Sequence, residues 1–135
     1  MRLRVATMAG AISLALGQPI AALGGNTGHF VAGTTVIFVT AAYCDEFEFV
    51  EHGIARAADR NGVDRSIMRA TINALLAQMD GPYDPKYLIP EITALVRDTM
   101  VGVKRTFAWD KNAACKEYGD IAVESGILRR RDGGR

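Results

Sequence analysis

No Asp, Glu, Lys or Arg occurs from Val5 through Cys44, whereas charged side chains recur every few residues from Asp45 onward. The chain therefore divides into two parts of different solubility. The first part begins with Met-Arg-Leu-Arg and a run of small apolar residues, which is the order of a basic n-region and an apolar h-region in an export signal. We therefore expect residues 1–24 to be a signal peptide and the mature protein to be periplasmic or secreted.

Two positions satisfy the small-residue pattern for signal cleavage. A cut after Gly24 uses Ala22 and Gly24 as the small residues, and a cut after Gly17 also fits, although Pro19 then lies close behind it. The alternative is a retained anchor, since residues 5–24 have about the length of a helix that spans a membrane. The run is rich in Ala and Gly, so its insertion into a membrane would gain little hydrophobic free energy.

The uncharged segment 25–43 contains a second apolar run, from Phe30 to Thr40. Its Val-Ile-Phe-Val core with flanking threonines suits either an extended segment or a buried helix, and periodicity does not decide between them. An exposed run of this kind would aggregate, so it must pack on the rest of the protein, on a partner, or in a membrane as the second arm of a helical hairpin. The candidate partner-binding residues are five of its apolar side chains: Phe30, Val36, Ile37, Phe38 and Val39.

Residues 44–128 show the spacing of amphipathic helices and predict an all-α, four-helix domain. The expected helices run from Asp45 to Arg60, from Asp64 to Met79, from Pro90 through Val103 and from Asp110 to a stop at Gly126. Asp64 and Asp110 suit N-caps, and Trp109 stands where a hydrophobic staple would pack on the last helix. The short connections favour an antiparallel bundle or a more irregular orthogonal packing, which the pattern does not distinguish.

The chain has only two cysteines, and they do not form a Cys-x-x-Cys motif. Cys44 opens the first expected helix and Cys115 lies in the last, so in an oxidising compartment we predict a disulfide between them. That bond would close a loop of about seventy residues and stabilise the domain by roughly 4 kcal/mol. With His29 and His52 as the only histidines, neither a redox motif nor a four-ligand zinc cluster can be drawn, and we predict no metal and no cofactor.

No residue pattern indicates catalysis, and we predict that the protein is not an enzyme. His52 follows Glu48 by one helical turn and could share a metal or a proton with it, but a solvated ion pair on a helix surface is the interpretation that we favour. The serines have no neighbouring histidine and acid in a nucleophile-elbow pattern. If there were an activity, Glu48, His52 and Cys115 would be the residues to test.

The formal net charge is +1, which does not point to nucleic acid. The positive charges concentrate at the end of the chain, where residues 129–135 contain Arg129, Arg130, Arg131 and Arg135. A run of this kind is usually a solvated basic tail. The partner that we expect is therefore a protein, with membrane association left to the N-terminal segment.

The stretch Cys44-Asp45-Glu46-Phe47, with a later helical cysteine at Cys115, resembles small periplasmic acid-stress chaperones, in which a cysteine precedes an acidic pair and an aromatic residue. The resemblance covers these residues only, the cysteines are further apart here than in that family, and we assign no family on it. It implies a helical protein that binds unfolding clients. We therefore expect an exported, non-catalytic interaction or stress-protective module, the alternative being a membrane-tethered accessory subunit of an envelope complex.

Overall fold

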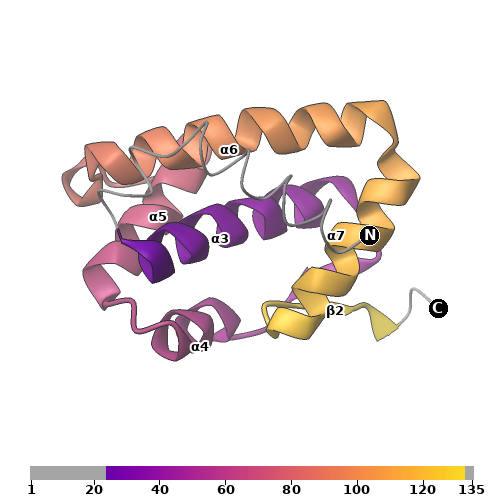
Figure 1. Cartoon of the computed structure of the whole chain (residues 1–135), viewed down its shortest axis with the longest axis horizontal. Helices are drawn as coiled ribbons and strands as arrows, with labels where there is room; N and C mark the ends of the chain where they lie inside the picture. The colour runs from indigo at the N-terminus through magenta and orange to yellow at the C-terminus, as the bar shows by residue number, and fades with distance from the viewer. Residues whose placement is uncertain (1–23, 133–135) are drawn as a thin grey trace.

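The computed structural model describes residues 24–132 (Figure 1). The expected signal peptide and anchor lie almost wholly outside these residues. The described elements, in chain order, are α3 (Gly25–Tyr43), β1 (Phe47–Phe49), α4 (Gly53–Arg60), α5 (Arg65–Gln78), the 3-10 helix η1 (Pro85–Tyr87), α6 (Pro90–Trp109), α7 (Lys111–Ser125) and β2 (Leu128–Arg130). The predicted largely helical architecture is confirmed, but the described part of the chain has one α-helix more than the predicted four and a small sheet.

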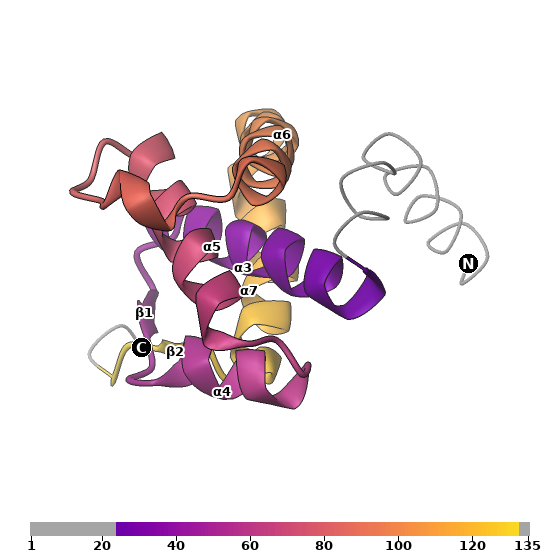
Figure 2. The ribbon, with the colours of Figure 1, turned by 90° about the vertical axis from the view of Figure 1, so that its left-hand side faces the viewer.

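The uncharged segment forms the central helix, α3, which settles the choice between strand and helix. Helices α5, α6 and α7 all contact it, and Figure 2 shows α3 in the middle of the other helices. A helix that is apolar around its whole circumference requires such a position. Its threonines can be buried there because Thr35 and Thr40 donate hydrogen bonds to the carbonyl oxygens of Val31 and Val36, both at 2.8 Å. Within residues 24–132, no helix combines the length and the hydropathy needed to cross a membrane.

The predicted helix from Asp45 to Arg60 is wrong in its first half. Strand β1 occupies that half and pairs antiparallel with β2, with Glu48 opposite Arg129, and α4 begins only at Gly53. The apolar spacing of the segment fits a helix, yet its Phe-Glu-Phe alternation fits a strand equally well. The partner strand, some eighty residues further along, decides between the two.

The other three predicted helices are confirmed, with their ends set by the expected residues. The Asp64 and Asp110 carboxylates cap α5 and α7 by accepting from backbone N–H groups three residues later, each at 3.1 Å. Pro90 opens α6, where its missing N–H costs nothing. Gly126 ends α7 in the left-handed conformation, φ 82°, that glycine adopts most readily.

Asp64 also gives a pH-dependent prediction. Hydrogen bonds from the Ser66 hydroxyl and then from the Ile67 N–H hold the pKa of this carboxyl below its ordinary value of 3.8. A depressed pKa in the folded state means that the cap stabilises the protein above the ordinary pKa and that this contribution is lost as pH falls through the folded-state pKa. We expect Asp64→Ala to lower the thermal midpoint at pH 7 and to lower it less at pH 2 to 3. A difference in midpoint that is constant across this range would contradict the capping role.

The predicted disulfide between Cys44 and Cys115 is confirmed, with 5.8 Å between the two Cα atoms. It joins the C-terminal end of α3 to α7. Next to it, the Phe107 ring lies 5.0 Å from Tyr43 and 5.8 Å from Tyr118, between ring centroids. The ends of α3, α6 and α7 are therefore tied together at one corner of the molecule.

The start of the expected basic tail is a strand rather than a solvated tail. Arg129 pairs with Glu48 and Arg130 pairs with Asp120 at 2.9 Å. The Arg130 guanidinium also lies over the Phe47 ring, 5.0 Å from its centroid. The positive charges of this segment thus hold β2 onto β1 and α7.

Candidate functional site

The five candidate partner-binding residues do not form one exposed surface. Phe30, Ile37 and Val39 are buried in the core, while Val36 and Phe38 are half-buried. A helix places successive side chains on different sides, so the apolar run is divided between the core and two surface hollows. Only Val36 and Phe38 remain accessible for contact with a partner.

Val36 lines a groove between three helices, which we call the α3–α4–α7 groove. It has a volume of about 350 Å³, within the range of ligand pockets. Its walls come from the start and middle of α3, the end of α4, the second half of α7 and the residue before β2: His29, Phe30, Gly33, Thr34, Val36, Ile37, Ala57, Arg60, Asn61, Tyr118, Ile121, Ser125 and Ile127. Most of these side chains are apolar.

Ile121 is the residue of this groove that the sequence misplaced. The spacing of Ala114, Cys115, Tyr118, Ile121 and Ala122 predicts that all five face inward on the last helix, but the Ile121 side chain is 52% exposed at the groove edge. The inner position is taken by Gly119, which packs against the Phe47 ring. Ala114, Cys115 and Ala122 are buried as the same spacing predicts, so Ile121 is the exception, and a glycine has no side chain that would have marked its own position as an inner one.

Charged groups of opposite sign flank the groove. Arg60 crosses it and donates a hydrogen bond from Nη2 to the Ser125 carbonyl oxygen at 2.6 Å. Arg56 lies one turn before Arg60 on α4, and Glu117 and Glu124 lie on either side of Ile121 on α7; all four are exposed. Of these four residues, only Arg60 lines the groove.

Phe38 lines a second hollow, the α3–β1–α5 groove, of about 310 Å³. The Phe38 and Phe49 rings contact each other there, with 4.9 Å between centroids. The remaining lining residues come from the β1–α4 connection, α4 and α5: Val50, His52, Gly53, Ile54, Ala55, Met68 and Ile72. Of the two apolar hollows, the α3–α4–α7 groove is the larger, at about 350 Å³.

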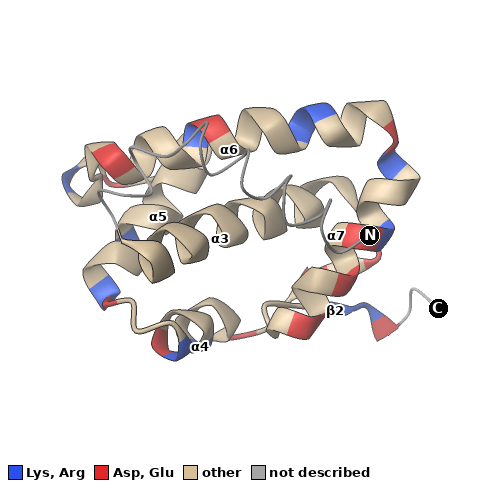
Figure 3. Cartoon of the chain, viewed as in Figure 1, with Lys and Arg blue, Asp and Glu red and all other residues tan. Residues whose placement is uncertain are grey.

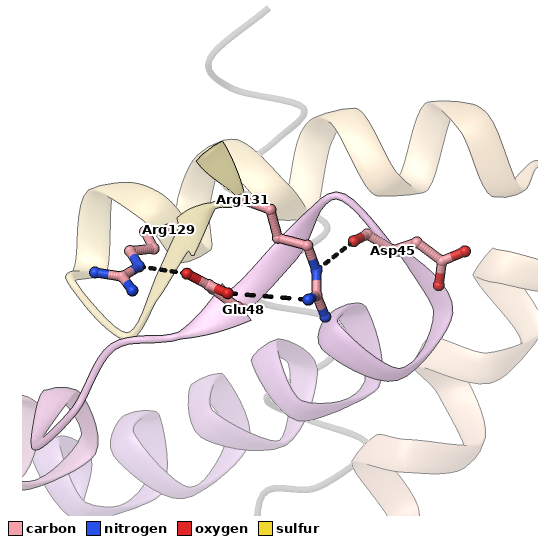
Figure 4. A network of polar contacts seen from close by, with 4 residues as sticks. All are labelled: Asp45, Glu48, Arg129 and Arg131. Atoms are coloured by element: carbon pink, nitrogen blue, oxygen red, sulfur yellow. Dashed lines mark hydrogen bonds and ion pairs between the residues drawn. The ribbon is translucent and has the colours of Figure 1, made fainter. Parts of the chain in front are cut away.

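The Glu48 carboxylate on β1 contacts two arginines at the C-terminal end of the chain. Its Oε2 accepts a hydrogen bond from Arg129 Nε at 2.7 Å, and its Oε1 lies 3.9 Å from Arg131 Nη1 (Figure 4). Arg131 also donates from Nε to the Asp45 carbonyl oxygen at 2.7 Å. Both carboxylate oxygens of Glu48 therefore face arginines from the far end of the chain.

The other two residues of the enzyme hypothesis are also placed apart from one another. His52 is exposed, and its Nε2 lies 3.5 Å from Glu51 Oε2 rather than pairing with Glu48. Cys115 is in the disulfide and has no thiol. In the part of the chain that the structure describes, no three His, Cys, Asp or Glu side chains are grouped so that they could hold a metal ion.

The surface beside the disulfide is hollowed as well, with a volume of about 360 Å³. Its lining is polar and carries both signs of charge: Tyr43, Cys44, Asp45, Glu46, Lys111, Asn112, Cys115, Lys116 and Arg130. The mixed charges do not select an anionic or a cationic ligand.

Comparisons with protein-family models, with curated protein sequences and with solved structures found no match. A function for this chain therefore has to be argued from its own surfaces.

Proposed function

We propose that the protein is an exported, non-catalytic helical module that binds apolar segments of a protein partner or client through the α3–α4–α7 groove. The observation that carries the proposal is the apolar floor of this groove, with the exposed Ile121 at its edge and Val36 within it. An apolar side chain removed from water in such a groove contributes about 1.5 to 3 kcal/mol to binding. A shallow groove of this kind suits reversible binding of varied sequences.

Two features support the export part of the proposal. The order of basic and apolar residues in 1–24 is that of a signal peptide, and a disulfide is typical of proteins outside the cytoplasm. The apolar lining of the groove supports the binding part, because it can remove apolar side chains of a client segment from water. The tethered alternative differs in retaining residues 5–24, which the mass of the protein from its host envelope would distinguish.

Ile121 and Val123 offer a matched test of the groove. Both are exposed apolar residues of α7, at 52% and 37%, but only Ile121 lines the groove. We expect Ile121→Asp to raise, by at least about tenfold, the concentration of full-length protein that halves the aggregation of a chemically unfolded client, because the lost apolar contact is worth that factor. Light scattering after dilution of the client from denaturant measures this.

Val123→Asp is the control and should leave the protective concentration unchanged. Thermal unfolding of both variants checks that they remain folded. Equal loss in both variants, or unchanged protection by Ile121→Asp, would contradict binding in the α3–α4–α7 groove.

A further inference from the structure

Trp109 is the most exposed large apolar side chain among residues 24–132, at 90%. It is the last residue of α6 and directly precedes the Asp110 cap of α7. The expectation that it would pack on α7 as a hydrophobic staple is therefore wrong. Because an indole ring has a large apolar surface, leaving it almost wholly in water is unfavourable.

The surrounding structure holds Trp109 in this position. Phe107, two residues earlier, is buried in the aromatic cluster at the disulfide corner. The Asp110 N–H donates to the Thr106 carbonyl oxygen at 3.2 Å, and the Asp110 carboxylate accepts from the Ala113 N–H at 3.1 Å. The backbone on both sides of the indole is thus anchored at the turn from α6 into α7, at the right of Figure 1.

Positive charges surround the indole. Arg105 and Val101 precede Trp109 by four and eight residues, so the three lie on one face of α6, and Val101 is also exposed. Lys104 flanks this face and Lys111 begins α7. None of these three cations takes part in an ion pair within the described residues, and Figure 3 shows blue segments on both sides of the turn.

The nearby acids offset the charge of Lys111 more than the charges of Lys104 and Arg105. The Asp110 carboxylate is directed to the α7 backbone by its capping hydrogen bond, and Asp98 pairs with Arg97 at 3.4 Å. Asp45 and Glu46 share the hollow beside the disulfide with Lys111, but they do not line the face that carries Arg105. The C-terminal half of α6 therefore presents an aromatic ring with two cations near it, Lys104 and Arg105, that form no ion pair within the described residues.

We infer that this surface, the Trp109 corner (Val101, Lys104, Arg105, Trp109 and Lys111), binds the surface of an anionic lipid bilayer. A tryptophan ring favours the headgroup region because its body is apolar and its N–H can still find a hydrogen-bond acceptor. Lys and Arg side chains beside it are attracted to anionic headgroups and keep their charges in water.

A protein partner fits this surface less well. Tryptophans that dominate protein interfaces usually lie at the centre of a packed patch, with a ring of neighbours that excludes water. Trp109 instead protrudes from a helix end among cations, with little apolar surface around it. The corner is separate from the α3–α4–α7 groove, none of whose lining residues belongs to it, so the inference does not depend on the proposed function.

The chain has a single tryptophan, so its fluorescence reports on this corner directly. With full-length protein and vesicles of phosphatidylcholine and phosphatidylglycerol, we expect the emission to move to shorter wavelength and quenching by acrylamide to fall several-fold. Vesicles of phosphatidylcholine alone should produce neither change, and added salt should weaken the effect. Lys104→Glu combined with Arg105→Glu should lower the partition coefficient by at least about tenfold, because two attractions become repulsions.

A reporter at the other end of α6 controls for binding through residues 5–24. Tyr83 is 45% exposed in the loop that precedes α6, and α6 itself is 20 residues, or about 30 Å, long. In a Trp109→Phe, Tyr83→Trp variant we expect the tryptophan to stay accessible to acrylamide on anionic vesicles. The inference would be overturned if anionic vesicles protected the tryptophans at positions 83 and 109 from acrylamide equally. It would also be overturned if the Trp109 emission responded equally to neutral vesicles, or did not respond to anionic vesicles. A concentration-dependent shift without vesicles would assign the corner to self-association instead.

Discussion

Replacing both cysteines by alanine is expected to lower the free energy of unfolding by about 4 kcal/mol. The disulfide closes a loop of 71 residues that contains β1, α4, α5 and α6. Without the bond, the unfolded chain gains the conformational freedom of that loop. Since a domain of this size has a total stability of only about 5 to 15 kcal/mol, the loss is a large fraction of it. Urea unfolding followed by circular dichroism measures the change.

Reduction of the wild-type protein with a dithiol is the matching control, because it opens the same loop without changing the sequence. Both cysteine side chains are buried, so the alanine variant also leaves small voids and should be slightly less stable than the reduced protein. A loss below about 1 kcal/mol in both samples would show that the loop contributes little to the unfolded-state entropy, contrary to the expectation.

Gly119→Ala is expected to destabilise the protein by about 2 to 3 kcal/mol, although alanine is the better helix former. A Cβ at this position would overlap the end of the Phe47 ring, with Cε2 at 2.6 Å. The ring cannot move aside easily, because it is fully buried and the Arg130 guanidinium covers it. Thermal or urea unfolding measures the loss.

Gly102 supplies the matched control for this variant. It also lies inside a long helix, yet a Cβ there would meet nothing within 4 Å. Gly102→Ala should therefore stabilise the protein by up to about 1 kcal/mol through helix propensity alone. Phe47→Leu should recover part of the stability in the Gly119→Ala background, and strictly additive effects of the two changes would contradict a direct clash.

The large stability effects expected at the disulfide and at Gly119 show that substitutions in the core are poor tests of function. Phe30, Ile37 and Val39 belong to the same core as the disulfide and Phe47, so their replacement would change stability before it changed binding. The exposed residues Ile121 and Trp109 avoid this problem. Each can be altered while the core packing is preserved, and each belongs to a different surface.

The local signals in the sequence were sufficient for the three later helices and for the disulfide. Asp64 and Asp110 carry side chains that cap a helix, and Gly126 readily takes the left-handed conformation that ends one. Cys44 and Cys115 could be paired because the chain has no other cysteine. The helix ends depend on a residue and its near neighbours, and the disulfide follows because two cysteines allow only one pairing.

Tertiary structure alone decided the rest. The Phe-Glu-Phe run became strand β1 because β2 pairs with it from the far end of the chain, and the uncharged segment became a helix because α5, α6 and α7 surround it. The exposure of Ile121 and Trp109 likewise depends on what packs beside them. Capping and turn preferences act over a few residues, whereas strand pairing and burial depend on contacts between distant segments. The sequence by itself therefore determined where the three later helices begin and where α7 ends, and only the packed fold decided which apolar side chains were left exposed.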